Sequence, residues 1–264
     1  MTAAEHTTDP LGGQHDQKGD HANHANAHGE DDWDRGARAA HSGETVVDAE
    51  FWDAMYRSRT AAWSGRPNPQ LVTEAADLVP GSALEVGCGE GADAVWLAQR
   101  GWRVTAVDIS MTALGRAQDH AAQAGPDVAG RITWLQADLV GGSAPDLGSY
   151  DLVTAQFMHL PSAQRVALHA RLAAAVAPGG TLLVVGHHPS DAHAGVGRWS
   201  DSDLGFTAAQ VADVLDPSLW DVVADESRGR TVATADGDDH TVHDVVLVAR
   251  RLAGPGWQSG DAVR

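Results

Sequence analysis

Short apolar runs alternate with segments of helical periodicity along most of the chain. A run of four or five apolar residues predicts a strand buried on both faces, and apolar residues three or four positions apart predict a helix. Strands are expected at 83–87, 103–107, 131–136, 150–155 and 181–186. Helices are expected at 91–100, 110–124, 162–176 and 207–215. This alternation predicts an α/β fold with a parallel, doubly wound sheet that has helices on both faces.

The end of the chain has a different pattern. Two strand-like segments, 219–227 and 240–251, are joined by sequence that contains Gly and Asp. They predict an antiparallel pair that closes a mostly parallel, seven-stranded sheet. Pro178-Gly179-Gly180 predicts a sharp turn between the preceding helix and the fifth strand.

Four zones are expected from these boundaries. Residues 1–43 contain six of the 14 histidines and almost no large apolar side chains, so we expect a disordered tail. Residues 44–80 predict a helical lead-in or lid, with Asn68 and Pro69 starting its second helix. Residues 81–252 predict the folded domain, and 253–264 a loose tail.

The charge of the chain limits its partners. A formal net charge of −18 without a basic stripe disfavours a nucleic-acid or anionic membrane partner. No secretory signal and no apolar run of about 20 residues is visible, so the expected location is cytoplasmic. If the tail became helical, His21, His24 and His28 would lie near one face and could bind a divalent metal; the favoured alternative is a solvated tail with adventitious metal contacts, and no dedicated metal site is predicted.

The first predicted strand ends in three glycines, Gly87, Gly89 and Gly91. Glycines allow a sharp turn and a close approach of a ligand to the backbone, so this loop predicts a cofactor site. The same loop also fits a dinucleotide fingerprint, because Gly or Ala is accepted at its third position. The glycines alone therefore do not name the cofactor.

Acidic residues follow the next two predicted strands. Asp108, followed by Ile109, lies 21 residues beyond Gly87, where an acid can bind the two hydroxyls of a ribose. The alternative for Asp108 is a cap on helix 110–124, a role that Ser110 could fill instead. Asp138 can accept a hydrogen bond from an exocyclic amine, and the N–H of Leu139 can meet a ring nitrogen.

Taken in order, these segments resemble the class I S-adenosylmethionine-dependent methyltransferases from about Phe51 to Arg251. The segments that resemble motifs of this family are Glu85-x-Gly87-x-Gly89-x-Gly91, Asp108, Asp138-Leu139, Tyr150-Asp-Leu-Val-Thr-Ala-Gln156 and Pro178-Gly-Gly-Thr-Leu-Leu-Val184. The resemblance implies a Rossmann-like fold, S-adenosylmethionine as cofactor, and Gln156 beside the methionine amine and the methyl group. The lead-in, Phe51-Trp-Asp and Trp63-Ser-Gly-Arg66, resembles the small-molecule branch related to tellurite-resistance and thiopurine methyltransferases.

Other candidate site residues follow the strands or precede the core. His159, His187 and His188 are candidate general bases, and the alternative for each is an exposed loop histidine. Arg66 is a candidate partner of the cofactor carboxylate and Trp63 a candidate lid, or both pack a linker. Cys88 is the only cysteine and is expected to line the loop as a small residue rather than as a nucleophile.

The sequence therefore predicts methyl transfer to a small molecule through S, N, O or a metalloid. One alternative is a non-catalytic protein that binds S-adenosylmethionine or metal on the same scaffold. The other is an NAD-dependent dehydrogenase, which Asp138 and the antiparallel end of the sheet disfavour. The sequence leaves the acceptor and the oligomeric state open.

Overall fold

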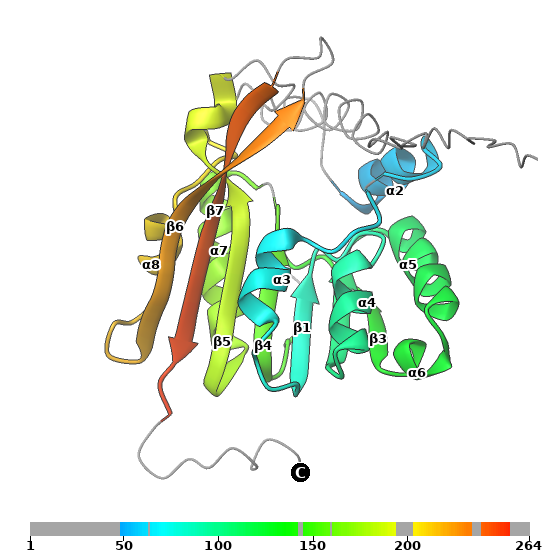
Figure 1. Ribbon diagram of the computed structural model, residues 1–264, viewed down its shortest axis with the longest axis horizontal. Helices are drawn as coiled ribbons and strands as arrows, with labels where there is room; N and C mark the ends of the chain where they lie inside the picture. Colours follow the sequence, from blue (N-terminus) through cyan, green and yellow to red (C-terminus); the bar gives the residue numbers. More distant parts are fainter. Residues whose placement is uncertain are drawn as a thin grey trace, which may run out of the picture.

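In the part of the chain that is described, seven strands form one sheet in the order β3-β2-β1-β4-β5-β7-β6 (Figure 1). The computed structural model describes residues 48–62, 64–141, 145–158, 160–193, 203–233 and 239–253. The strands are β1 (Ser82–Val86), β2 (Arg103–Asp108), β3 (Ile132–Gln136), β4 (Tyr150–Gln156), β5 (Val176–His187), β6 (Trp220–Ala233) and β7 (Asp239–Arg251).

Strands β1 to β5 pair in parallel, and β7 runs antiparallel to both β5 and β6. The predicted mostly parallel sheet with an antiparallel end is therefore confirmed. The chain proceeds from β1 outward to β3 and then returns to β4 on the other side of β1. Ligands of such sheets bind at this reversal, beyond the carboxyl ends of the strands.

Helices cover both faces of the sheet (Figure 1). One face packs against α3, α4 and α5, through apolar side chains such as Leu71, Leu97 and Leu114. The other face packs against α7 and α8, through Leu168 and Val211. The helices are α2 (Ala49–Arg57), α3 (Pro69–Ala75), α4 (Ala92–Gln99), α5 (Met111–Gln123), α6 (Pro126–Ala129), α7 (Ser162–Ala174) and α8 (Ala208–Ala212), with the 3-10 helix η1 at Pro189–His193.

The lead-in contains two helices that begin with side-chain caps. The Asp48 carboxylate accepts the Phe51 N–H at the start of α2. The Asn68 side chain accepts the N–H groups of Gln70 and Leu71 at the start of α3, with Pro69 in the first turn. The predicted cap of the second helix is therefore present, and α3 ends at Ala75.

The prediction of a turn before the fifth strand is wrong. Strand β5 already begins at Val176, and the glycine pair forms an irregularity inside it, where the pairing with β4 shifts register. Gly179 has φ +80°, and a Cβ on Gly180 would lie 2.9 Å from the Ala177 carbonyl oxygen. The glycines therefore let the strand bulge and continue.

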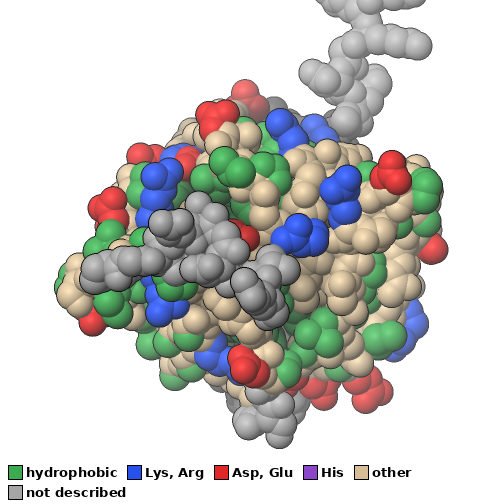
Figure 2. All heavy atoms as spheres, turned by 90° about the horizontal axis from the view of Figure 1, so that it is seen from below, with side chains coloured by type: hydrophobic (Ala, Val, Ile, Leu, Met, Phe, Trp, Pro, Cys, Tyr) green, Lys and Arg blue, Asp and Glu red, His purple; other side chains and the backbone are tan. Residues whose placement is uncertain are grey.

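The surface at the amino ends of the parallel strands carries arginine, acidic and apolar side chains interspersed (Figure 2). Among the described helices, none has the length and apolar character needed to cross a bilayer. The His-rich tail of residues 1–43 lies outside the described residues, so its predicted disorder and metal contacts stay predictions.

Candidate functional site

The glycine loop turns tightly at the carboxyl end of β1. Gly87, Gly89 and Gly91 have φ values of +71°, +52° and +81°, in the left-handed region that favours glycine. A Cβ on Gly87 would overlap the Sδ of Met158, and one on Gly91 would lie 2.8 Å from both Ala117 and Trp134. The loop thus needs glycine both for its backbone conformation and for its close packing.

Asp108 lies at the end of β2, directly beside this loop. Its Oδ2 accepts the Gly89 N–H at 2.8 Å, and its Oδ1 accepts the Ser110 N–H at 2.9 Å. Ser110 caps α5 through the Ala113 N–H, so the alternative role of Asp108 as the helix cap falls to Ser110. Burial raises the pKa of Asp108, and the amides of Ser110 and Gly89 offset part of that rise.

Glu85 is buried in β1 below the glycine loop and is 2 % exposed. Its Oε2 is the one buried side-chain oxygen or nitrogen of the described residues that has no hydrogen-bond partner. Burial raises the pKa of Glu85 well above its usual range, and the nearby Asp93 and Asp108 raise it further. Three acids therefore surround the loop, and one of them lacks a polar partner.

The predicted adenine contacts lie in the loop after β3. The Oδ1 of Asp138 accepts the N–H groups of Val140 and Gly141, at 2.9 and 2.8 Å. The Leu139 side chain is buried in the core. The Ile109 carbonyl accepts a hydrogen bond from the Gln136 side chain. The structure brings Asp138 and Ile109 to the same strand ends as Asp108, and their cofactor contacts stay predictions.

The end of β4 is conformationally unusual. Phe157 has φ +53° and is the only described residue other than glycine with positive φ. Its ring lies 4.3 Å from the ring of His187 at the end of β5. The Gln156 amide donates back to the Thr154 hydroxyl. Such backbone strain is found most often where a site needs it, and the rings here join the ends of two neighbouring strands.

The site roles stay predictions for four other residues, namely His159, Trp63, Arg66 and Cys88. His159 and Trp63 lie outside the described residues. Arg66 is exposed, and its backbone N–H contacts the Ser64 hydroxyl. Cys88 is buried with its thiol 4.0 Å from the Gly89 carbonyl oxygen, and burial raises the pKa of that thiol well above its usual value. A high thiol pKa agrees with a packing role for Cys88 rather than a nucleophilic one.

The lead-in is attached to the glycine loop by contacts that no motif in the sequence indicates. Glu90 of the loop is buried and forms an ion pair of 2.7 Å with Arg116 of α5. The same guanidinium donates to the carbonyls of Tyr56 and Arg59, both at 2.6 Å. Glu90 also accepts the N–H of Ala62. One buried ion pair therefore ties the end of α2 to the cofactor loop.

Two further acids attach the lead-in on either side of this ion pair. The Oδ1 of Asp53 accepts the Ser110 hydroxyl at 2.5 Å and the Thr112 N–H at 3.0 Å. Asp93 in the first turn of α4 accepts the Asn68 N–H at 2.6 Å. Burial raises the pKa of Asp93 to about 6, against the lowering effect of that hydrogen bond. No short motif in the sequence indicates these contacts.

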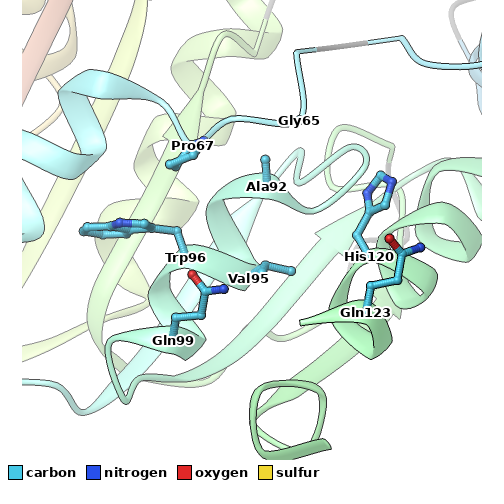
Figure 3. Close-up of a pocket in the computed structure, with 8 residues that line it drawn as sticks. All are labelled: Gly65, Pro67, Ala92, Val95, Trp96, Gln99, His120 and Gln123. Atoms are coloured by element: carbon cyan, nitrogen blue, oxygen red, sulfur yellow. The ribbon is translucent and has the colours of Figure 1, made fainter. Parts of the chain in front are cut away.

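A hollow of about 320 Å³ lies on the outer side of α4 (Figure 3). Trp96 lies below Pro67 on one wall, and His120 and Gln123 of α5 form the other. Gly65 and Pro67, the neighbours of Arg66, also line it. None of Glu85, Asp108 or Asp138 is among its lining residues, so the hollow is separate from the acids at the strand ends.

The sheet order, the glycine loop and the acids at the strand ends can now be compared with known proteins. Residues 83–180 match the family described as methyltransferase domain. Over these residues the chain is similar to a methyltransferase domain, and its sheet has the Rossmann-like methyltransferase fold. The resemblance of this domain to the tellurite-resistance and thiopurine branch stays a prediction.

Curated proteins are similar to parts of the chain. An uncharacterized methyltransferase of Mycobacterium tuberculosis is 43% identical over 102 residues, which are 39% of this chain and 48% of that protein. The chain thus spans about half the length of the curated relatives that it matches.

Solved structures share the fold. A structure solved in work on the conversion of a disulfide bond into a thioacetal group during echinomycin biosynthesis has a TM-score of 0.60 at 22% identity, covering 79% of this chain and 93% of that one. The glycopeptide N-methyltransferase MtfA, in complex with S-adenosyl-L-methionine, has a TM-score of 0.52 at 22% identity, covering 72% and 88%.

Proposed function

We propose that this protein binds S-adenosylmethionine at the glycine loop and transfers its methyl group to a small molecule. The observation that carries the proposal is the buried acid group around the loop. The charges of Asp93 and Asp108 act on Glu85, and Glu85 Oε2 has no hydrogen-bond partner among the described residues. Such a site favours a ligand with positive charge and N–H donors.

S-adenosylmethionine fits that requirement, because it carries a sulfonium and an ammonium group. The buried acids supply acceptors for the ammonium group and compensate the positive charge. Asp108 lies where an acid can bind the ribose hydroxyls. The pyrophosphate of a dinucleotide would instead add negative charge beside the same acids, which argues against the dehydrogenase alternative.

When bound, the sulfonium makes the methyl group electrophilic, so the cofactor supplies the reactivity. The protein then has to orient the acceptor in line with the methyl group and exclude water. Glu90, Arg116 and Asp53 hold the lead-in beside the loop and α5, where it can close the site. Phe157 and His187 stand at the neighbouring strand ends, where an acceptor would enter.

Two observations support a small acceptor. One fold neighbour was solved in work on echinomycin biosynthesis, and another is named as a glycopeptide N-methyltransferase. The net charge of −18 disfavours a polyanionic acceptor such as RNA. We propose that the acceptor atom is S, N, O or a metalloid, as the sequence leaves it.

Methyl-labelled S-adenosylmethionine tests this proposal directly. The full chain is incubated with three fractions of a cell extract, namely small molecules, RNA and protein, and heat-inactivated chain is the control. We expect enzyme-dependent label in the small-molecule fraction. Label in RNA or protein alone would contradict a small acceptor. Binding of S-adenosylhomocysteine without any labelled product would instead favour the non-catalytic alternative.

A further inference from the structure

A second polar cluster lies at the same edge of the sheet, beyond β5 and β7. His188 follows β5 directly, Ser190 and Asp191 belong to η1, and His243 comes from β7. The backbone N–H of His188 donates to the backbone carbonyl of His243 at 3.1 Å, and the centroids of the two imidazole rings lie 6.4 Å apart. His187, the residue before His188, contacts Phe157 at the end of β4. The cluster therefore lies at the carboxyl end of β5, which is one of the strand ends where ligands of such sheets bind.

Asp191 fixes the orientation of His243. Asp191 is 2 % exposed, and its Oδ2 accepts the His243 backbone N–H at 2.6 Å. Its Oδ1 lies 3.1 Å from His243 Nδ1. Because a carboxylate only accepts hydrogen bonds, Nδ1 carries a proton, and in the neutral ring Nε2 is the acceptor. The His243 side chain is 40% exposed, so a ligand can reach this ring.

The neutral ring of His188 is in the other tautomer. The backbone N–H of Ser190 donates to its Nδ1 at 3.2 Å. Because a backbone N–H only donates, Nδ1 of His188 is the acceptor, and the ring proton is on Nε2. The two rings thus offer one hydrogen-bond acceptor, on His243, and one donor, on His188. A carboxylate that accepts a ring N–H fixes the tautomer and the orientation of that imidazole.

We propose that His243 and His188 bind the methyl acceptor through a weakly acidic hydroxyl or thiol next to a carbonyl. The hydroxyl or thiol donates to Nε2 of His243, and the carbonyl accepts from Nε2 of His188. Asp191 acts as a positioning residue through His243. The inference rests on the proposed function, because it names the acceptor class of the same site.

Salicylamide is a suitable probe, since it carries a hydroxyl next to a carbonyl, and benzamide is its matched control without the hydroxyl. Binding of each to the full chain is measured by calorimetry, with and without S-adenosylhomocysteine. We expect saturable binding of salicylamide and about tenfold or more weaker binding of benzamide, the effect of one lost hydrogen bond to a charge-supported group. NMR should show the ring signals of His188 and His243 shifting first among the 14 histidines.

Three variants separate recognition from folding. His243→Asn keeps a donor toward Asp191 but removes Nε2, so salicylamide should bind about tenfold or more weakly. Asp191→Asn should weaken binding and change the His243 ring signals while that ring is still present. His240→Asn, on the same strand but outside the cluster, should bind like wild type.

Equal salicylamide affinity in wild type and His243→Asn would overturn the inference. So would equal affinity for benzamide and salicylamide, or no saturable binding of salicylamide to wild type. The proposed function is tested separately: it would be contradicted if S-adenosylhomocysteine did not bind to wild type. The probe measurements made without S-adenosylhomocysteine then still decide the inference.

Discussion

The two halves of the carboxyl-terminal edge hold their polar side chains in different ways. On the side of β1 to β3, the acids accept backbone N–H groups from nearby loops, as Asp108 does from Gly89 and Ser110. On the side of β5 and β7, Asp191 holds a side chain 52 residues away, that of His243. The first half is set by local backbone shape, whereas the second is assembled only by the complete sheet.

This difference predicts unequal costs for substitutions. Changes near the glycine loop should cost stability, because they disturb backbone geometry and buried charge. Changes in the cluster of His188, Asp191 and His243 that touch only exposed ring atoms should cost binding of the acceptor and little stability. The following tests are ordered by the size of the expected effect on the free energy of unfolding.

Gly91→Ala should lower the free energy of unfolding by about 3 kcal/mol, because it adds strain at positive φ and overpacks against Ala117 and Trp134. Gly65→Ala is the matched control, with φ +68° and no atom within 4 Å of the added Cβ, and should cost only about 1 kcal/mol. Urea unfolding measures both. Equal costs would show that the close packing of the loop is not what requires glycine.

Arg116→Gln should destabilise the chain by about 2 to 3 kcal/mol, because it leaves the buried Glu90 carboxylate without its ion pair. Arg57→Gln removes an exposed ion pair with Asp53 and should cost no more than about 0.5 kcal/mol. Hydrogen exchange should then show faster exchange of α2 in Arg116→Gln. Unchanged exchange in α2 would contradict the role of this ion pair in holding the lead-in.

Asp93→Asn should make stability less dependent on pH. Burial raises the pKa of Asp93 to about 6, so the folded chain holds this proton to higher pH than the unfolded chain does. The contribution of Asp93 to stability is complete below about pH 4 and is lost as the pH rises through about 6. The variant should therefore gain about 2 kcal/mol relative to wild type between pH 4 and pH 8.

Urea unfolding of both proteins across this pH range checks the sign, since titrating groups that do not interact with Asp93 cancel in the difference; Glu85, whose pKa Asp93 raises, does not cancel. A variant that loses stability relative to wild type as the pH rises would contradict the burial of a protonatable Asp93.

His188→Ala should change the free energy of unfolding by less than about 0.5 kcal/mol, because its ring is only partly buried and bonds mainly within its own turn. Its affinity for S-adenosylhomocysteine should equal that of wild type. Thermal unfolding and calorimetry measure the two quantities. A loss comparable to that of Gly91→Ala would remove the distinction between the two halves.

The same distinction explains what the sequence could predict. The strands and the mostly parallel sheet with its antiparallel end follow from short apolar runs. Gly87, Gly89 and Gly91 lie in one short loop, and Asp108 ends the next strand, so each of these signals can be read locally. The contact of Asp191 with His243 and the ion pair of Glu90 with Arg116 join distant segments. Apolar periodicity says nothing about such pairs, because it fixes which face a residue occupies and not which neighbour it meets.

The irregularity in β5 shows the same limit on a smaller scale. Pro178-Gly179-Gly180 is typical of a turn, yet pairing with β4 on both sides of the glycines keeps the segment within the strand. Neighbouring strands here outweigh the local preference of the chain.

The central claim is that the acids around the glycine loop bind S-adenosylmethionine. Calorimetry with S-adenosylhomocysteine on wild type and Asp108→Asn tests it most directly. The account predicts saturable binding to wild type and at least about tenfold weaker binding to the variant, because a ribose hydroxyl loses a charged partner. No binding to wild type, or equal affinity in the two proteins, would contradict it.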